Sequence, residues 1–142
     1  KNDSIRSITN ARKLIRKYGK EEIIQRSKII QEKVIASELY HQSSSISVYI
    51  STEFEVKTDL IITDIFECGK KCFVPCYHDI TMNMARVFSL EEIKKYPLNY
   101  DNIYQPEGPF NSENSSQFID LYIVPGLAFT KNGVRVGRGK VD

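Results

Sequence analysis

One stretch of about thirty residues limits the possible folds of this chain more than any other feature. Residues 46–51 form an apolar run that predicts a buried strand, and residues 58–69 predict a helix capped by Thr58. Residues 71–75 predict a second short strand, which its final proline should stop. A strand, a helix and a strand in so short a stretch are typical of the right-handed βαβ unit, in which the two strands run parallel.

The segments on either side extend this unit into an α/β fold. The first 40 residues predict two helices with Gly19 as the stop between them, and residues 82–88 predict another strand. Ser89 and Glu92 have the spacing of a capping box, which predicts a short helix. Residues 119–126 are the most continuous apolar run and should form a central, parallel strand. We therefore expect an open, mainly parallel sheet flanked by helices in a Rossmann-like, three-layer arrangement.

The composition excludes several classes of protein. With 142 residues and a hydrophobic content of 41%, the chain is large enough for a single domain over residues 1–142 with its own core. A net charge of +2 is too small to favour nucleic acid as a partner. No apolar run approaches the roughly 20 residues of a membrane helix, so we expect no membrane contact and a cytoplasmic location.

The three cysteines, Cys68, Cys72 and Cys76, are spaced four residues apart, which raises the question of a metal site. A zinc motif of this kind needs a second pair of ligands. The sequence has no second cysteine pair, and its two histidines are His41 and His78. We therefore expect three free, unrelated thiols, as in a reducing compartment.

The last part of the chain has the composition of an anion-binding loop. It combines four cations with four glycines, which are Lys131, Arg135, Arg138 and Lys140 with Gly126, Gly133, Gly137 and Gly139. Glycines let backbone N–H groups approach phosphate oxygens, and the cations supply charge-assisted hydrogen bonds. The spacing matches neither the P-loop nor the dinucleotide-binding pattern. A basic hairpin turn around Asn132 and Gly133 is the alternative.

Several motifs of the chain occur in a characteristic order. A basic helix that contains Ile5 and Arg6 is followed by LIITDIFECGKKCFVPCY, MARVFSLEEI and IYQPEG. The last motif is DLYIVPGLAFTKNGVRVGRGK, which begins at Asp120. Together they resemble the 5-formyltetrahydrofolate cyclo-ligase family, also called methenyltetrahydrofolate synthetases, over nearly the whole chain.

This resemblance implies an ATP-dependent ligase that closes 5-formyltetrahydrofolate to 5,10-methenyltetrahydrofolate and releases ADP and phosphate. ATP and Mg²⁺ would take part, because phosphoryl transfer depends on positioning and charge neutralisation. ATP contacts are implied at Arg6, Arg135, Val136, Gly137, Arg138, Gly139 and Lys140. Substrate contacts are implied at Ile50, Glu55, Arg138, Gly139 and Lys140, with Glu55 accepting hydrogen bonds from the pterin ring. Arg138 and Lys140 would be the catalytic residues, and Asp142 would bind the metal.

The chain also departs from the family pattern. Thr130 replaces an aspartate and Cys76 replaces an arginine. Val141 and Asp142 stand where the family continues with glycine and two tyrosines. The resemblance implies a further helix, a further strand and a second metal-binding aspartate beyond this point. We therefore expect a domain that is C-terminally incomplete, with a central strand left without a neighbour and its apolar surface uncovered.

Three functions are compatible with the sequence. The leading one is a monomeric cyclo-ligase that acts on 5-formyltetrahydrofolate and ATP. The second is a truncated, catalytically impaired form that only binds nucleotide or folate, and coupled ATP hydrolysis with methenyl formation would distinguish the two. The third is RNA binding through the basic first helix and the Arg/Gly tail. It is disfavoured because no aromatic stacking platform accompanies these cations.

Overall fold

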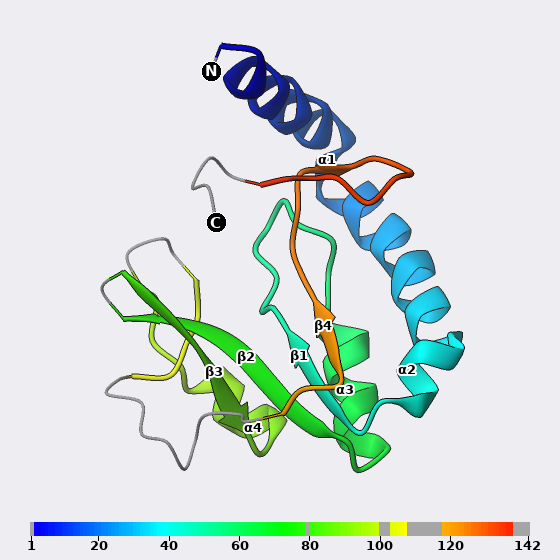
Figure 1. The fold of residues 1–142 in the computed structure, drawn as a ribbon, viewed down its shortest axis with the longest axis vertical. Helices are drawn as coiled ribbons and strands as arrows, with labels where there is room; N and C mark the ends of the chain where they lie inside the picture. The colour runs from blue at the N-terminus through cyan, green and yellow to red at the C-terminus, as the bar shows by residue number, and fades with distance from the viewer. Residues whose placement is uncertain (1, 79, 100–102, 108–117, 138–142) are drawn as a thin grey trace.

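The centre of the structure is a four-stranded sheet with the strand order β3-β2-β1-β4 (Figure 1). Strand β1 (Ser45–Val48) is parallel to both of its neighbours, β2 (Lys71–His78) and β4 (Leu121–Ile123). Strand β3 (Thr81–Val87) pairs antiparallel with β2 to form a hairpin. The α/β class with a mainly parallel sheet is therefore confirmed. This computed structural model describes residues 2–78, 80–99, 103–107 and 118–137.

Four helices flank the sheet in the described residues, namely α1 (Asn2–Ala36), α2 (Glu38–Gln42), α3 (Asp59–Glu67) and α4 (Leu90–Lys94). All four contribute side chains to one apolar cluster, which packs on the sheet face that carries Ile46, Val48 and Val74. Helix α3 joins β1 to β2, so the predicted βαβ unit is confirmed. No described helix adds to a cluster on the opposite face, and the third layer of the predicted arrangement stays a prediction.

One strand prediction was wrong in detail. Strand β2 does not end at Pro75 but continues to His78. Proline is tolerated there because the pairing of β1 with β2 ends at Ser47 and Phe73, before Pro75 is reached, so no ladder hydrogen bond from β1 requires its N–H. Strand β4 is parallel to β1, as expected. Among the described strands it has β1 as its one neighbour, as expected for a domain without the family's C-terminal segment, and its Tyr122 side chain is exposed.

Helix α1 contains the break that the sequence predicted. Gly19 has φ 73° and ψ 166°, outside the helical region, and the helix resumes after it. Beyond this kink, the side of α1 that faces α3 carries Ile23 and two buried polar residues, Ser27 and Gln31. Burying a polar group costs little free energy only when the group is hydrogen-bonded. Both side chains have such partners, in the segment that leads into α3 and in its first turn.

Helix α3 receives its N-terminal hydrogen bonds from α1. Thr58 occupies the N-cap position as predicted, but its hydroxyl donates instead to the Tyr49 carbonyl, at 2.7 Å. The side-chain oxygen of Gln31 accepts from the backbone N–H groups of Leu60 and Ile61, at 2.8 and 3.3 Å. The first turn of α3 is therefore satisfied by a residue 29 to 30 positions away in the sequence.

The three cysteines are free thiols, as expected. Cys68 is exposed at the end of α3, whereas Cys72 and Cys76 are buried in β2. Burial raises the pKa of the Cys72 and Cys76 thiols to about 12, so both are unreactive at neutral pH. Within the described part of the chain, no three side chains of His, Cys, Asp or Glu are grouped as metal ligands would be.

The segment after β4 is a hairpin, which was the alternative to a phosphate-wrapping loop. Strands β5 (Ala128–Phe129) and β6 (Arg135–Val136) pair antiparallel around a turn in which Gly133 has φ 85°. A positive φ of this size favours glycine, which explains the Asn-Gly pair at the turn.

Among the helices of the described residues, none has both the length and the apolar character that a bilayer crossing requires.

Candidate functional site

The site lies where the parallel strands end. Strands β1 and β4 point in the same direction, so the loop after β1 (residues 49–58) and the segment after β4 (residues 124–137) leave the same edge of the sheet (Figure 1). In open α/β sheets, ligands bind at this carboxyl edge. The sequence placed Ile50 and Glu55 in the first segment, and Arg135, Val136 and Gly137 in the second.

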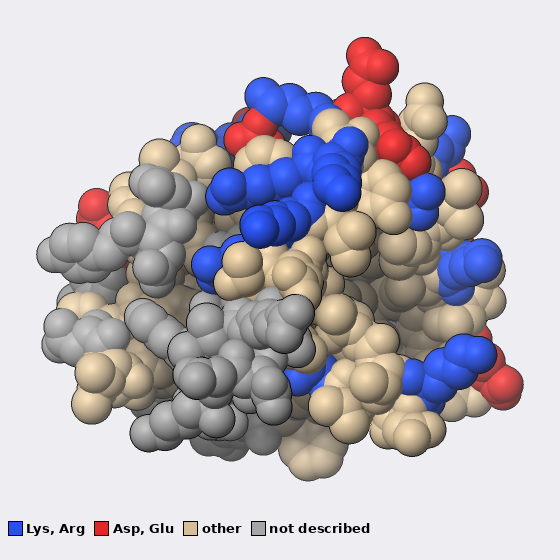
Figure 2. All heavy atoms as spheres, turned by 90° about the horizontal axis from the view of Figure 1, so that it is seen from above, with Lys and Arg blue, Asp and Glu red and all other residues tan. Residues whose placement is uncertain are grey.

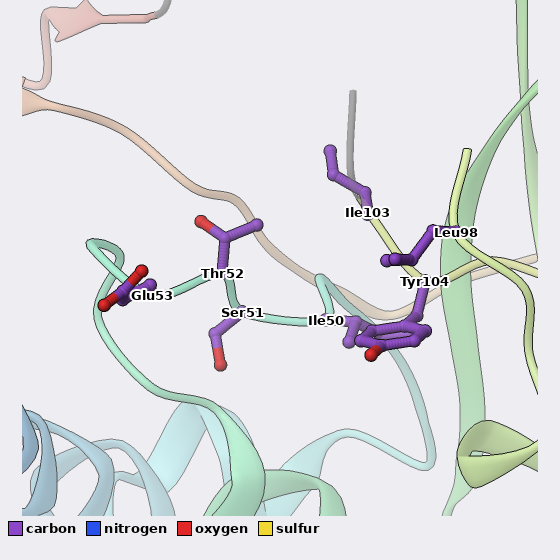
Figure 3. Close-up of a pocket in the computed structure, with 7 residues that line it drawn as sticks. All are labelled: Ile50, Ser51, Thr52, Glu53, Leu98, Ile103 and Tyr104. Carbon is purple, nitrogen blue, oxygen red and sulfur yellow. The ribbon is translucent and has the colours of Figure 1, made fainter. Parts of the chain in front are cut away.

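A cavity of about 320 Å³ opens beside the loop after β1. One wall comes from that loop, with Ile50, Ser51, Thr52 and Glu53, and the other from the segment after α4, with Leu98, Ile103 and Tyr104. Figure 3 shows the Ile50 side chain next to the Tyr104 ring, with Thr52 and Glu53 farther along the loop. The cavity thus offers an apolar part and a polar part, as sites for flat, polar-edged ligands do.

Hydrogen bonds within the loop fix the polar wall. One carboxylate oxygen of Glu55 accepts from the Thr52 backbone N–H at 2.9 Å and from the Thr52 hydroxyl at 2.7 Å. The Lys57 ammonium donates to the carbonyls of Thr52 and Glu53, at 2.7 and 3.0 Å. Both side chains therefore close the loop on itself and hold Thr52 in place. Glu55 acts on the cavity through Thr52 in this structure, and Glu53 is the carboxylate that lines it.

Helix α1 anchors the same loop from outside. The Ser27 hydroxyl accepts from the Lys57 backbone N–H at 2.9 Å, and the Lys20 ammonium lies 2.7 Å from the Glu53 carboxylate. Hydrogen bonding to Glu53 and its charge raise the pKa of Lys20. The Arg16 guanidinium lies 5.7 Å from the centre of the Phe54 ring. The basic first helix is therefore partly a support for the loop, whereas the sequence assigned its charge to a solvated face or to ATP.

The base of the loop is closed by Tyr49. Its hydroxyl donates to the Val56 carbonyl at 2.7 Å, and its own carbonyl accepts from Thr58. Burial raises the pKa of Tyr49, and the nearby Glu55 carboxylate acts in the same direction. The phenol is therefore protonated at neutral pH and remains a hydrogen-bond donor. The loop is held at its two ends, in its middle and against α1.

The cavity's second wall is attached to β2 by Gln105, a residue that the sequence did not single out. Its side-chain amide donates to the Tyr77 carbonyl at 2.7 Å and accepts from the Tyr77 N–H at 2.9 Å. Gln105 is only 9% exposed, and buried polar groups are stable only when they are hydrogen-bonded. In the sequence, Gln105 belongs to the motif IYQPEG. That motif supported the family resemblance but did not indicate which residue Gln105 would contact.

The positive charges are exposed at the same end of the molecule. Seen from above in Figure 2, Lys and Arg side chains gather on this face, and the exposed cations of the N-terminal half of α1 include Arg12, Lys13, Arg16 and Lys17. In the hairpin, Arg135 is exposed and its Nε donates to the Pro125 carbonyl at 2.6 Å. Gly137 lies beside the Arg135 guanidinium, where an added Cβ would be 3.5 Å from its nitrogens.

Several residues of the expected ATP and metal sites lie outside the described part of the chain. These are Arg138, Gly139, Lys140 and Asp142, together with the side chain of Arg6. The structure therefore describes Arg135, Val136 and Gly137 of the expected ATP contacts, and Ile50 and Glu55 of the expected folate contacts. Of these, Ile50 lines the cavity directly.

The fold and the cavity define an α/β domain whose binding site lies at the carboxyl edge of a mainly parallel sheet. The sequence profile of the 5-formyltetrahydrofolate cyclo-ligase family matches residues 1–140, and the chain belongs to this family. It is 43% identical over 130 residues to a mouse 5-formyltetrahydrofolate cyclo-ligase, covering 89% of this chain and 64% of the relative. A probable 5-formyltetrahydrofolate cyclo-ligase of Caenorhabditis elegans is 35% identical over 131 residues, with the same two coverages of 89% and 64%.

A solved structure has the same fold. The NMR structure of Aquifex aeolicus 5,10-methenyltetrahydrofolate synthetase superposes with a TM-score of 0.70 at 23% sequence identity. The match covers 92% of this chain and 66% of the Aquifex chain. This chain thus spans 64% of the length of the two animal relatives.

Proposed function

We propose that this chain performs the ATP-dependent cyclisation of 5-formyltetrahydrofolate to 5,10-methenyltetrahydrofolate, with release of ADP and phosphate. The observation that carries the proposal is the cavity at the carboxyl edge of the sheet, lined by Ile50, inside a chain that matches the cyclo-ligase family over residues 1–140. The mouse and nematode relatives carry the name of this activity.

The cavity suits the folate. A pterin ring is flat and apolar on its faces, so Ile50 and the Tyr104 ring can pack against it, while its edge carries N–H groups that donate to a carboxylate. Glu53 lines the cavity, and Glu55 holds Thr52 beside it. We assign the folate to this cavity, with Glu53 in the accepting role that the resemblance gave to Glu55 and with Glu55 as its support.

The cations suit the phosphates of ATP. In the proposed reaction the formyl oxygen takes the γ-phosphoryl group and ADP leaves, and N10 of the folate then attacks the activated carbon and expels phosphate. Negative charge builds up on the transferred group, and Arg135, Arg138 and Lys140 would neutralise it from the end of the chain. Mg²⁺ would share in this neutralisation when bound. Its proposed ligand, Asp142, lies outside the described residues.

We also propose that the protein works as a cytoplasmic monomer, without nucleic acid as a partner. The small net charge of +2 supports the last point, since nucleic-acid-binding domains concentrate much more positive charge. Light scattering after size exclusion would test the oligomeric state. A mass of twice the 16.4 kDa of the chain would contradict the monomer.

The activity can be tested by the absorbance of 5,10-methenyltetrahydrofolate after 5-formyltetrahydrofolate, Mg²⁺ and ATP are added to the chain. We expect an increase that requires ATP, that Lys140→Ala and Arg138→Ala abolish, and that the exposed hairpin variant Lys131→Ala retains. If no increase occurs but both ligands bind, the chain is a binding form without turnover. If 5-formyltetrahydrofolate does not bind, the proposed function is wrong.

A further inference from the structure

The cavity lies beyond the point where β1 and β2 separate. Their pairing ends at Ser47 and Phe73, and β2 continues alone on that side to His78. Backbone groups of residues two apart in a strand face the same edge. The N–H and C=O of Tyr77 face away from β3, toward Gln105, so Pro75 faces that edge too. Because proline has no N–H, a longer β1 would gain no hydrogen bond from it, and the chain turns away after Val48.

The amide of Gln105 occupies the position on β2 that β1 has left. Its donated bond of 2.7 Å and its accepted bond of 2.9 Å to Tyr77 reproduce the two hydrogen bonds of a paired strand residue. The same amide oxygen accepts from the Asn99 side chain at 3.0 Å. Asn99 in turn bonds the backbone of Ile103, through its own N–H at 2.9 Å and through its side-chain oxygen at 3.1 Å.

These contacts hold the apolar wall of the cavity. Leu98 immediately precedes Asn99, and the backbone of Ile103 is hydrogen-bonded to Asn99. Tyr104 immediately precedes Gln105. All three line the cavity opposite Ile50. Leu98 and Tyr104 of this wall are 51% and 49% exposed, whereas Gln105 is buried, and its amide attaches the wall to β2.

We propose that Gln105 is a positioning residue for the folate, because it fixes the distance between the Tyr104 wall and Ile50. This inference rests on the proposed function. The chemistry requires an amide: one atom must donate to a carbonyl while another accepts from an N–H, and a carboxylate can do only the second. A carboxylate at this position would face the Tyr77 carbonyl without a proton between them.

The test compares Gln105→Glu with Gln25→Glu, the same substitution at an exposed position of α1, in the whole chain. Affinities for 5-formyltetrahydrofolate and for ATP are measured separately by titration calorimetry. We expect Gln105→Glu to weaken folate binding roughly tenfold at neutral pH and to leave ATP binding unchanged. At acidic pH the carboxyl group takes up a proton and can donate again, so folate affinity should return toward that of the wild type measured at the same pH.

The outcomes separate the inference from the function. Unchanged folate affinity in Gln105→Glu would overturn the inference alone. An equal loss of folate and ATP affinity would also overturn it, because that loss would reflect a general structural defect. No folate binding by the wild-type chain would overturn the proposed function and this inference with it. Hydrogen exchange adds a check without ligand: residues 103–105 should exchange faster in Gln105→Glu and not in Gln25→Glu.

Discussion

Two segments leave the carboxyl edge of the sheet from neighbouring strands, and they differ in how they are attached to the rest of the fold. The loop after β1 is bonded to helix α1 as well as to itself: Ser27 and Lys20 hold it from outside, and the buried Tyr49 closes its base. The hairpin after β4 is bonded mainly to itself. Its described hydrogen bonds run between residues 125 and 136, and Phe129 and Val134 are each 59% exposed.

This difference matches what each segment is proposed to bind. A flat ring is recognised by the shape of a cavity, which must be fixed in advance to give affinity. A triphosphate is recognised by charge, which acts over longer distances and tolerates a less rigid support. The comparison therefore suggests a folate site that is ready in the free chain and a nucleotide site whose support is local. The following variants test the two halves of this comparison.

The largest effect is expected from Gln31→Ala, which removes the link between α1 and the start of α3. Two backbone N–H groups, those of Leu60 and Ile61, lose their acceptor. We expect a loss of about 2 to 3 kcal/mol in the free energy of unfolding, measured by urea denaturation. Gln25→Ala, at an exposed position of the same helix, should change it by less than about 0.5 kcal/mol. Equal effects of the two variants would show that α1 does not anchor this region.

A smaller effect is expected from Lys57→Met, which keeps the length of the side chain but removes the ammonium that closes the loop. The lost bonds to the Thr52 and Glu53 carbonyls are partly exposed to solvent, so we expect the free energy of unfolding to fall by about 1 kcal/mol. Folate affinity should fall about fivefold, because Thr52 and Glu53 line the cavity. Lys131→Met in the hairpin should change neither quantity. Unchanged folate affinity in Lys57→Met would mean that the loop keeps its shape without this lysine.

In the hairpin, Gly133→Ala should have a local effect only. A side chain at φ 85° is strained by about 1 kcal/mol. Because the hairpin is bonded to itself, we expect the urea midpoint to stay unchanged while the amides of Thr130 and Val134 exchange about fivefold faster with solvent. Gly133→Asn, which tolerates this conformation better, should exchange at close to the wild-type rate. A lower urea midpoint in Gly133→Ala would show that the hairpin is part of the cooperative core.

The smallest effect is expected at the opposite, amino end of the strands, from Asp120→Asn. The backbone N–H groups of Ser44 and Ser45 donate to the Asp120 carboxylate and lower its pKa below the usual 3.8. A lowered pKa in the folded state stabilises the protein above the unfolded pKa, and this contribution is lost as the pH falls through the folded pKa. The wild type should therefore lose stability below about pH 4 more steeply than Asp120→Asn, measured by acid titration with circular dichroism. Parallel titration curves would show that this carboxylate does not tie β1 to β4.

The local elements were predictable because their signals are local. The kink at Gly19, the capping box of Ser89 and Glu92 and the turn at Gly133 each depend on the conformational preference of a few adjacent residues. In the capping box, the Ser89 hydroxyl accepts from the Glu92 N–H as the spacing predicted. The apolar periods were equally informative, since they placed the strand, helix and strand of the βαβ unit in the correct order.

The contacts of the candidate site were less predictable. The resemblance to the cyclo-ligases gave Ile50, which lines the cavity, and it gave Glu55, which the structure turns toward Thr52. It did not give the role of Gln105, which meets its partner Tyr77 across 28 positions of sequence. Nor did it show that the Gln31 side chain would accept a hydrogen bond from the first turn of α3.

By itself, the sequence determined the α/β class, the parallel pairing at the centre and the family. These follow from the periodicity of apolar residues, the turn residues and the order of the motifs, all of which are local patterns of the sequence. Tertiary structure alone decided how β2 can run through Pro75 and where the cavity opens. Each of these depends on which backbone groups find partners in distant segments. A hydrogen bond such as that between Gln105 and Tyr77 has no counterpart in local sequence preference, and it forms only after the sheet and its loops have come together.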